Sequence, residues 1–287
     1  MEDRIQIKAK ELLCGAYDLH THTIPSHLDR ALDDIDLVRQ ASEAGMAGVV
    51  IKNHYEPTGA RAQLVNRHHF GTARAYGTVV LNHPVGGLNA YAVYSALEMG
   101  ASLVFMPTRD AENCLRDASL QKNFFARPGI SILDETGRLK KEVFDIMDIV
   151  KKYGAALATG HISPLESEIL CREGLKRGVR MVLTHPEWYR TTVPLAIQKE
   201  LARQGAWIEK CFYNLEDGSC TAAEMASHIR SIGASHCFMT TDRGQYGKAL
   251  PAVAMESFIQ SLLREGIRDP EIALMLREVP REVLGLK

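Results

Sequence analysis

The sequence predicts an α/β protein built as one (β/α)8 barrel, or TIM barrel, on the strength of three observations. Short apolar segments rich in β-branched residues alternate with longer helical patterns along the chain. Six helical patterns end on a glycine just before the next apolar segment, and glycine tolerates the left-handed conformation that caps a helix. The alternation gives eight units in a chain of the right size for this barrel, which is typically roughly 250 residues long. A doubly wound open sheet is the alternative, but it usually has fewer units.

The expected strands cover residues 16–22, 47–53, 76–82, 101–107, 155–161, 179–185, 206–212 and 236–242. The expected helices between them include residues 33–45, 88–100, 139–154, 167–178, 194–205 and 221–233. An amphipathic helix precedes the first strand, and residues 269–287 should form one final helix that closes the barrel base. The longest connection, about residues 108–138, should contain a small hairpin turning at "DETG". Because no linker or low-complexity tract interrupts the pattern, we expect a single domain spanning residues 1–287.

The amino-acid composition argues against nucleic acids and membranes as binding partners. The formal charge is −1 and the basic residues are spread along the chain, so we expect neither a nucleic-acid nor an anionic-membrane surface. No apolar run approaches the 18 or so residues of a membrane span. Six scattered cysteines without a C-x-x-C pair are typical of reduced thiols in a cytoplasmic protein. A small-molecule substrate is the expected partner, and self-association into a homo-oligomer is left open.

Polar side chains follow almost every expected strand. The first strand ends "DLHTHT", and residues two apart on a strand share a face, so His20 and His22 should point at one place. A single histidine at a strand end is more often a loop residue than a ligand. Here, however, the pattern recurs at the same end of the other strands, where barrel active sites lie. The strand-end residues are Lys52, His54, Asn82, Arg109, His161, His185, Glu209 and Asp242.

Imidazole and carboxylate groups together favour a divalent metal ion. They suit Zn²⁺ above all, with Mn²⁺ and Fe²⁺ as alternatives. A catalytic ion of this kind keeps an open position for a water molecule and lowers its pKa. A nearby aspartate can then take up and pass on the proton. The sequence therefore predicts one or two divalent ions at the carboxyl ends of the strands.

This arrangement resembles the amidohydrolase superfamily of metal-dependent hydrolases over residues 15–287. Stretches such as "VVIKNHYEPT", "ATGHISP" and "LTHPE" further resemble one amidohydrolase-like family of unknown function. The resemblance implies that His20, His22 and His161 bind metal. It implies that His185 binds a second metal or polarises the substrate carbonyl. Asp242 would bind metal and act as the general base.

One departure from the superfamily pattern concerns the bridge between two metal ions. Members with two ions usually carry a carboxylated lysine or a glutamate at the end of strand four, whereas this chain has "MPTRD" there. Lys52 on strand two could supply the carbamate, with His54 as a further ligand on the same face. The alternative is that Lys52 stays an unmodified cation that binds substrate anions.

The resemblance implies cleavage of an amide, cyclic amide or lactone bond in a small polar substrate by metal-activated water. Lys52, Arg109, Arg127 and Arg243 near the expected mouth favour an anionic substrate. Asn82, Asn89, Arg109 and Glu209 are candidate substrate contacts, although Asn89 could instead cap a helix and Glu209 could orient a ligand histidine.

The same residues leave three alternatives to this hydrolase. A metal-dependent decarboxylase could use the same residues, and a non-catalytic ligand-binding barrel would be expected to have lost some of them. "DLHTHT" also begins the polymerase-and-histidinol-phosphatase phosphoesterases. That family is disfavoured because Asn53, Asn82 and Gly244 stand where it needs Asp, Glu and His.

Overall fold

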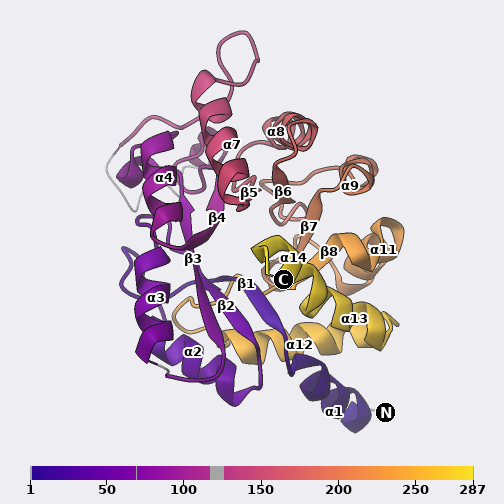
Figure 1. Ribbon diagram of the computed structural model, residues 1–287. Helices are drawn as coiled ribbons and strands as arrows, with labels where there is room; N and C mark the ends of the chain where they lie inside the picture. The colour runs from indigo at the N-terminus through magenta and orange to yellow at the C-terminus, as the bar shows by residue number, and fades with distance from the viewer. Residues whose placement is uncertain (1, 69, 117–125, 287) are drawn as a thin grey trace.

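The protein is an eight-stranded parallel barrel surrounded by helices (Figure 1). The computed structural model describes residues 2–68, 70–116 and 126–286. Within these residues the strands follow one another round the sheet in chain order. They are β1 (Tyr17–Thr21), β2 (Gly48–Ile51), β3 (Arg74–Val80), β4 (Ala101–Phe105), β5 (Ala156–Ala158), β6 (Arg180–Leu183), β7 (Trp207–Cys211) and β8 (Cys237–Thr240). The predicted barrel is confirmed, and each strand overlaps its expected segment, with β3 beginning two residues earlier than predicted.

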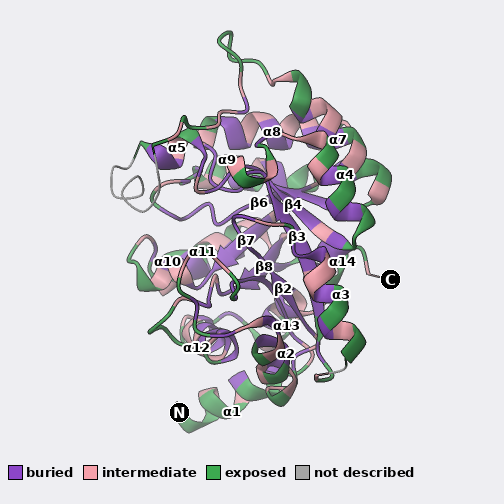
Figure 2. Cartoon of the chain, turned by 90° about the vertical axis from the view of Figure 1, so that its left-hand side faces the viewer, coloured by how far each residue is buried: buried purple, intermediate pink, exposed green. Residues whose placement is uncertain are grey.

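Helices pack round the outside of the barrel, so that their apolar faces cover the strands (Figure 2). The helices before β5 are α1 (Glu2–Leu13), α2 (Asp34–Glu43), α3 (Gly59–His68), η1 (His83–Val85), α4 (Ala90–Glu98), α5 (Glu112–Leu115) and α7 (Lys141–Tyr153). Those after β5 are α8 (Pro164–Lys176), α9 (Leu195–Arg203), α10 (Tyr213–Glu216), α11 (Ala222–Ile232), η2 (Ala234–His236), α12 (Pro251–Arg264), α13 (Asp269–Leu276) and α14 (Glu278–Leu284). Among the described residues, none of these helices has the length and apolarity to cross a membrane.

The barrel closes where β8 meets β1, just past the carboxyl ends of both strands. The amide of Asp242 donates to the carbonyl of His20 over 2.9 Å, and the amide of His22 donates to the carbonyl of Arg243 over 2.7 Å. Thr21 and Arg243 form an isolated parallel bridge at the same place. These backbone bonds set the last residues of the two strands side by side, although more than two hundred residues separate them in the chain.

The interior of the barrel is filled with apolar side chains and is closed at its base by α14. Leu19, Val50 and Phe105 belong to this inner cluster, and Val283 and Leu284 of α14 pack against it. In Figure 1, α14 lies over the middle of the strands, next to the carboxyl terminus of the chain. A packed interior leaves the opposite, carboxyl end of the strands as the place for a site.

The final helix predicted over residues 269–287 is two helices, α13 and α14, within the described residues. The break falls at Arg277, whose backbone angles (φ −122°, ψ −68°) are not helical. Pro280 explains it, since a proline ring clashes with the carbonyl four residues earlier, here that of Leu276. The predicted "DETG" hairpin is present, with the amide of Asp134 donating to the carbonyl of Arg138. The part of the long connection at residues 117–125 lies outside the described residues.

Candidate metal centre

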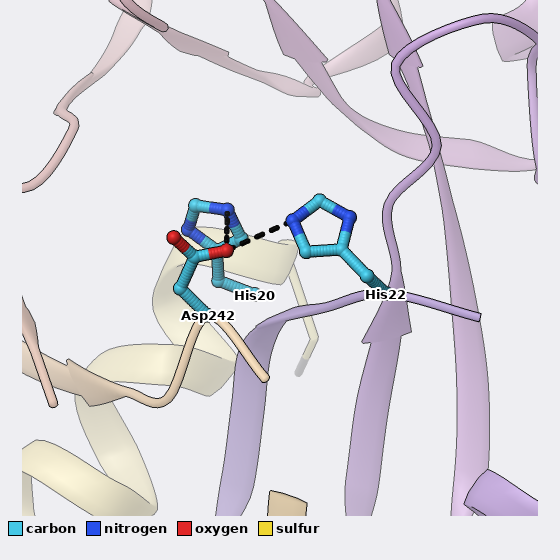
Figure 3. A group of neighbouring side chains, drawn as sticks. All are labelled: His20, His22 and Asp242. Carbon is cyan, nitrogen blue, oxygen red and sulfur yellow. Dashed lines mark hydrogen bonds and ion pairs between the residues drawn. The ribbon is translucent and has the colours of Figure 1, made fainter. Parts of the chain in front are cut away.

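His20, His22 and Asp242 converge at the carboxyl end of β1 and β8 (Figure 3). Their ligand atoms all lie within 4.8 Å of one another. Oδ1 of Asp242 lies 2.9 Å from Nε2 of His22 and 3.3 Å from Nε2 of His20. The two imidazoles come from alternate positions of β1, as the His-x-His spacing predicts, and the closure between β1 and β8 brings up the carboxylate.

The far side of each imidazole ring is fixed by an acceptor. Nδ1 of His20 lies 2.7 Å from Oε1 of Glu209, and Nδ1 of His22 lies 2.8 Å from the backbone carbonyl of Lys52. A carboxylate or carbonyl oxygen can only accept, so Nδ1 carries the proton in both rings. Metal-binding histidines are held in this way, with the second nitrogen donating to a carbonyl or carboxylate.

In this tautomer, Nε2 of His22 faces Oδ1 of Asp242, and a cation between the two atoms would relieve their repulsion. Burial, followed by the charge of Arg30, lowers the pKa of His22 well below its ordinary value, so Nε2 of His22 carries a lone pair. Burial raises the pKa of Asp242, but the charge of His20 and the bond to His22 outweigh it and hold that pKa well below its ordinary value. Nε2 of His22 and Oδ1 of Asp242 lie 2.9 Å apart, and two such acceptors approach this closely only with a proton or a cation between them. The donor set of two imidazoles and a carboxylate could hold a divalent metal ion, and it suits Zn²⁺ or a similar ion.

Lys52 lies against this cluster. Its Nζ is 2.8 Å from Nε2 of His20, and the side chain is 1% exposed. Burial lowers the pKa of Lys52 to about 8, because a buried ammonium loses its hydration. Neutral pH lies about one unit below this pKa, so roughly a tenth of Lys52 is the neutral amine there, and the carboxylates nearby favour the charged form.

Three more predicted histidines lie around the same pocket, which also contains His22, Lys52 and Asp242 and encloses about 190 Å³. The ring of His54 stacks on His22 with centroids 4.9 Å apart, and the rings of His161 and His185 lie 5.1 Å apart. Burial lowers the pKa of His54 and His161 well below the ordinary value and that of His185 to about 4. All three are therefore neutral, as metal ligands must be.

His185 and Asp242 have an unusual backbone. They are the two non-glycine residues with positive φ among those the structure describes, at 23° and 51°. Such conformations cost about 1–3 kcal/mol each and cluster at functional sites. The hydroxyl of Thr191 donates to the carbonyl of His185 over 3.1 Å and so can accept from Nδ1 of that ring, at 3.4 Å. Nε2 of His185 then keeps its lone pair, which favours the ligand role over that of a hydrogen-bond donor.

Glu209 orients the centre and does not line the pocket. Its carboxylate accepts from Nδ1 of His20 and Oγ1 of Thr240, both over 2.7 Å, and from the amide of His185 over 2.9 Å. Burial raises its pKa, but the charge of His20 and the bond from that ring outweigh burial, so the pKa is about 2. Of the two predicted roles, the structure therefore favours orientation of a ligand histidine over substrate contact.

Asn82 and Asn89 hold backbone groups and are not among the residues that line the pocket. The amide of Asn82 donates to the carbonyl of His54 and accepts from the amide of Thr108, and the residue is fully buried. Asn89 caps α4, accepting from the amides of Tyr91 and Ala92. Asn89 thus takes the predicted role of a helix cap, and Asn82 satisfies backbone groups at a strand end; substrate contact by either residue stays a prediction.

Of the basic residues predicted at the mouth of the barrel, Arg127 and Arg243 do not line the pocket. Arg109 lines the pocket. Arg127 pairs with buried Asp110, and Arg243 is fully buried against Glu216. The pocket also contains residues outside the strand-end pattern, of which Trp188, just after strand six, is the one that the sequence marks as able to line it. They are Arg30, Trp188, Arg190, Tyr213 and Gln245.

The comparisons with known proteins place the chain in a family. Residues 15–209 match the model of DUF6282, a family of unknown function. The chain belongs to this family. The matched span includes His20, His22, His161 and His185 and ends before Asp242. No curated protein matches the sequence.

Solved structures share the fold. The probable dipeptidase PvdM from Pseudomonas aeruginosa has a TM-score of 0.66 and 10% identity, with 99% of this chain and 98% of that one covered. An amidohydrolase from the same organism has a TM-score of 0.64 and 12% identity, covering 96% and 99%. The organophosphorus hydrolase from Deinococcus radiodurans has a TM-score of 0.58 and 14% identity, covering 96% and 94%. The resemblance to an amidohydrolase-like family of unknown function is thus confirmed, and at these identities the structures show the shared fold.

Proposed function

We propose that this protein is a metal-dependent hydrolase that cleaves an amide, cyclic amide or lactone bond in a small polar substrate. The observation that carries the proposal is the contact between Nε2 of His22 and Oδ1 of Asp242. The two atoms lie 2.9 Å apart, and because burial disfavours the protonated form of His22, a metal ion can take the place of a shared proton. The fold supports it too, because the cluster lies at the end of the barrel where such enzymes carry their sites.

The proposal assigns His20, His22 and Asp242 to one ion, with His161 and His185 as further ligands. Zn²⁺ is the ion we favour, and Mn²⁺ or Fe²⁺ would suit the same donors. Bound there, a divalent ion would lower the pKa of a water molecule and polarise the substrate carbonyl. Asp242 remains ionised and can accept the proton of that water, then deliver it to the leaving nitrogen or oxygen. Glu209 keeps His20 in the tautomer that this requires.

Lys52 is the candidate bridge to a second ion. An ammonium 2.8 Å from Nε2 of His20 would repel a metal ion at that nitrogen. The neutral amine can instead attack CO2, forming an N–C bond and releasing one proton, which gives a carbamate anion. This change converts a cation that opposes metal binding into an oxygen ligand. His54, stacked on His22, is then available to the second ion.

The decarboxylase is the second candidate, because it could use the same residues. The phosphoesterase alternative is weakened by Gly244, since a Cβ atom there would lie 1.8 Å from the carbonyl oxygen of His22. No histidine fits at that position without moving β1.

A substrate panel tests the proposal. The purified protein, loaded with Zn²⁺ or Mn²⁺, is assayed on N-acyl amino acids, cyclic amides and lactones for proton or amine release, and on carboxylic acids for CO2 release. We expect hydrolysis of at least one class, reduced at least about 10²-fold in Asp242→Asn. CO2 release without hydrolysis would favour the decarboxylase. If the protein neither hydrolysed any of these substrates nor released CO2, the proposal would be contradicted.

A further inference from the structure

Two arginines line the pocket next to the candidate metal centre, and neither has a carboxylate partner among the residues that the structure describes. They are Arg30, from the loop after β1, and Arg109, from the loop after β4. The Nε of each is buried and makes no hydrogen bond there. By contrast, Arg61 pairs with Asp34 and Glu56, and Arg127 with Asp110. Arg61 and Arg127 are thus neutralised by carboxylates, whereas Arg30 and Arg109 form no ion pair within the described part of the chain.

Arg30 is placed with some precision by the backbone around it. The amide of Ala31 donates to the carbonyl of Gly244 over 2.9 Å, and Arg30 forms an antiparallel bridge with Gln245. The side chain is only 8% exposed. Burial lowers the pKa of Arg30 to about 10; the charge of Asp242, which forms no ion pair with Arg30, opposes this effect, and the charge of Arg109 adds to it. Burying a cation without a partner is unfavourable, and a second cation nearby adds to the cost. The missing anion is therefore expected from outside the chain.

Gln245 adds an acceptor at the same wall. Its Nε2 donates to the carbonyl of Asp242 over 2.6 Å, which fixes the orientation of the amide. Oε1 is consequently the free end, and it is buried without a hydrogen bond among the described residues. Since Gln245 lines the pocket, this oxygen can accept from an N–H group of a ligand.

We propose that Arg30 and Arg109 bind a carboxylate of the substrate, and that Gln245 accepts from an N–H group near that carboxylate. The proposal rests on the function proposed above and specifies its substrate class: an amide or cyclic amide that carries a carboxylate close to its N–H, such as an N-acyl amino acid. Guanidinium groups match a carboxylate in two parallel bonds. A cavity of about 190 Å³ admits a molecule of this small size.

Binding of N-acetylglycine to the purified, metal-loaded protein tests this substrate class. Its neutral analogue N-acetylglycinamide keeps the N–H groups and removes the carboxylate. Isothermal titration compares both ligands on wild type, Arg30→Gln, Arg30→Lys and Arg109→Gln. Arg138→Gln is the control, because Arg138 is exposed in the hairpin outside the pocket. Metal content and thermal unfolding are recorded for every variant.

We expect N-acetylglycine to bind at least about tenfold more tightly than the amide, and each arginine-to-glutamine change to remove about tenfold or more. Arg30→Lys should fall between, since it keeps the charge without the paired bonds. Metal content should match wild type, and Arg30→Gln should unfold at the same or a higher temperature. Equal binding of the two ligands, unchanged binding in both glutamine variants, or no binding at millimolar concentration would overturn the proposal. Carboxylate binding in a protein that takes up no metal would sustain it and refute the hydrolase.

Discussion

Glu209→Gln should loosen the candidate metal centre without touching a ligand. The Glu209 carboxylate accepts three hydrogen bonds, from His20, Thr240 and the amide of His185. A glutamine side chain offers one acceptor and one donor, so its NH2 group must face an N–H or O–H donor in either orientation. The backbone amide of His185 cannot turn away. One charge-assisted bond is therefore lost, at a cost of about 1.5–3 kcal/mol in the free energy of unfolding of metal-free protein.

The second consequence concerns metal affinity. Removing the partner of a ligand histidine typically lowers affinity about 10–100-fold, and Glu209 holds His20 and the backbone of His185 together. Urea unfolding of chelated protein measures the first effect, and competition with a chromogenic chelator measures the second. Glu135→Gln, at an exposed position of the "DETG" turn, is the matched control. If Glu209→Gln unfolded like the control and kept wild-type metal affinity, the orienting role of Glu209 would be refuted.

Three further predictions concern the scaffold around the site. Glu187 forms a buried ion pair with Lys210, so Glu187→Gln should lower the free energy of unfolding by about 3–5 kcal/mol. Adding Lys210→Met should restore part of this loss, because it removes the unpaired buried charge. If urea unfolding showed that the losses of the two changes add, the pairing would be contradicted. Burial raises the pKa of Asp18 from 3.8 to about 7. The native state therefore holds the proton more tightly and loses stability as pH rises through this range. Asp18→Asn should be up to about 4 kcal/mol more stable than wild type at pH 8 and no more stable near pH 3. The same difference in unfolding free energy between variant and wild type at both pH values would argue against the raised pKa of Asp18. An alanine at position 244 would place its Cβ 1.8 Å from the His22 carbonyl oxygen, on a backbone with φ at 125°. Gly244→Ala should therefore lower the free energy of unfolding by about 2 kcal/mol or more and reduce the metal content. A variant with the melting temperature and metal content of wild type would contradict this close packing.

The fold could be predicted from the sequence because each strand and helix is a local pattern. All eight strands fall where alternating apolar segments predict them. The division between α13 and α14 was missed, although Pro280 signals it. The apolar periodicity continues across the break and therefore predicts one helix. Pro280 cannot donate a hydrogen bond to the carbonyl of Leu276, and this divides the helix.

The site could be predicted in part for the same reason. His20, His22, His161, His185 and Asp242 end strands, and the carboxyl ends of barrel strands meet.

Residues in loops gave no such signal. Arg30 reaches the pocket because its loop pairs with Gly244 and Gln245, a contact between opposite ends of the chain. Asn82 and Asn89 show the converse limit. The sequence marks a polar side chain at a strand end, but only the structure shows that its hydrogen bonds are already made.

Elemental analysis of the purified protein tests the central claim most directly. Wild type is compared with His22→Ala, Lys52→Ala and the control His68→Ala, since His68 is exposed at the end of α3. We expect about one or two equivalents of Zn, Mn or Fe in wild type and control, and a loss in His22→Ala. A fall from two equivalents to one in Lys52→Ala would identify the carbamate bridge. Absence of metal from wild type, even after supplementation, would contradict the metal centre and the hydrolase with it.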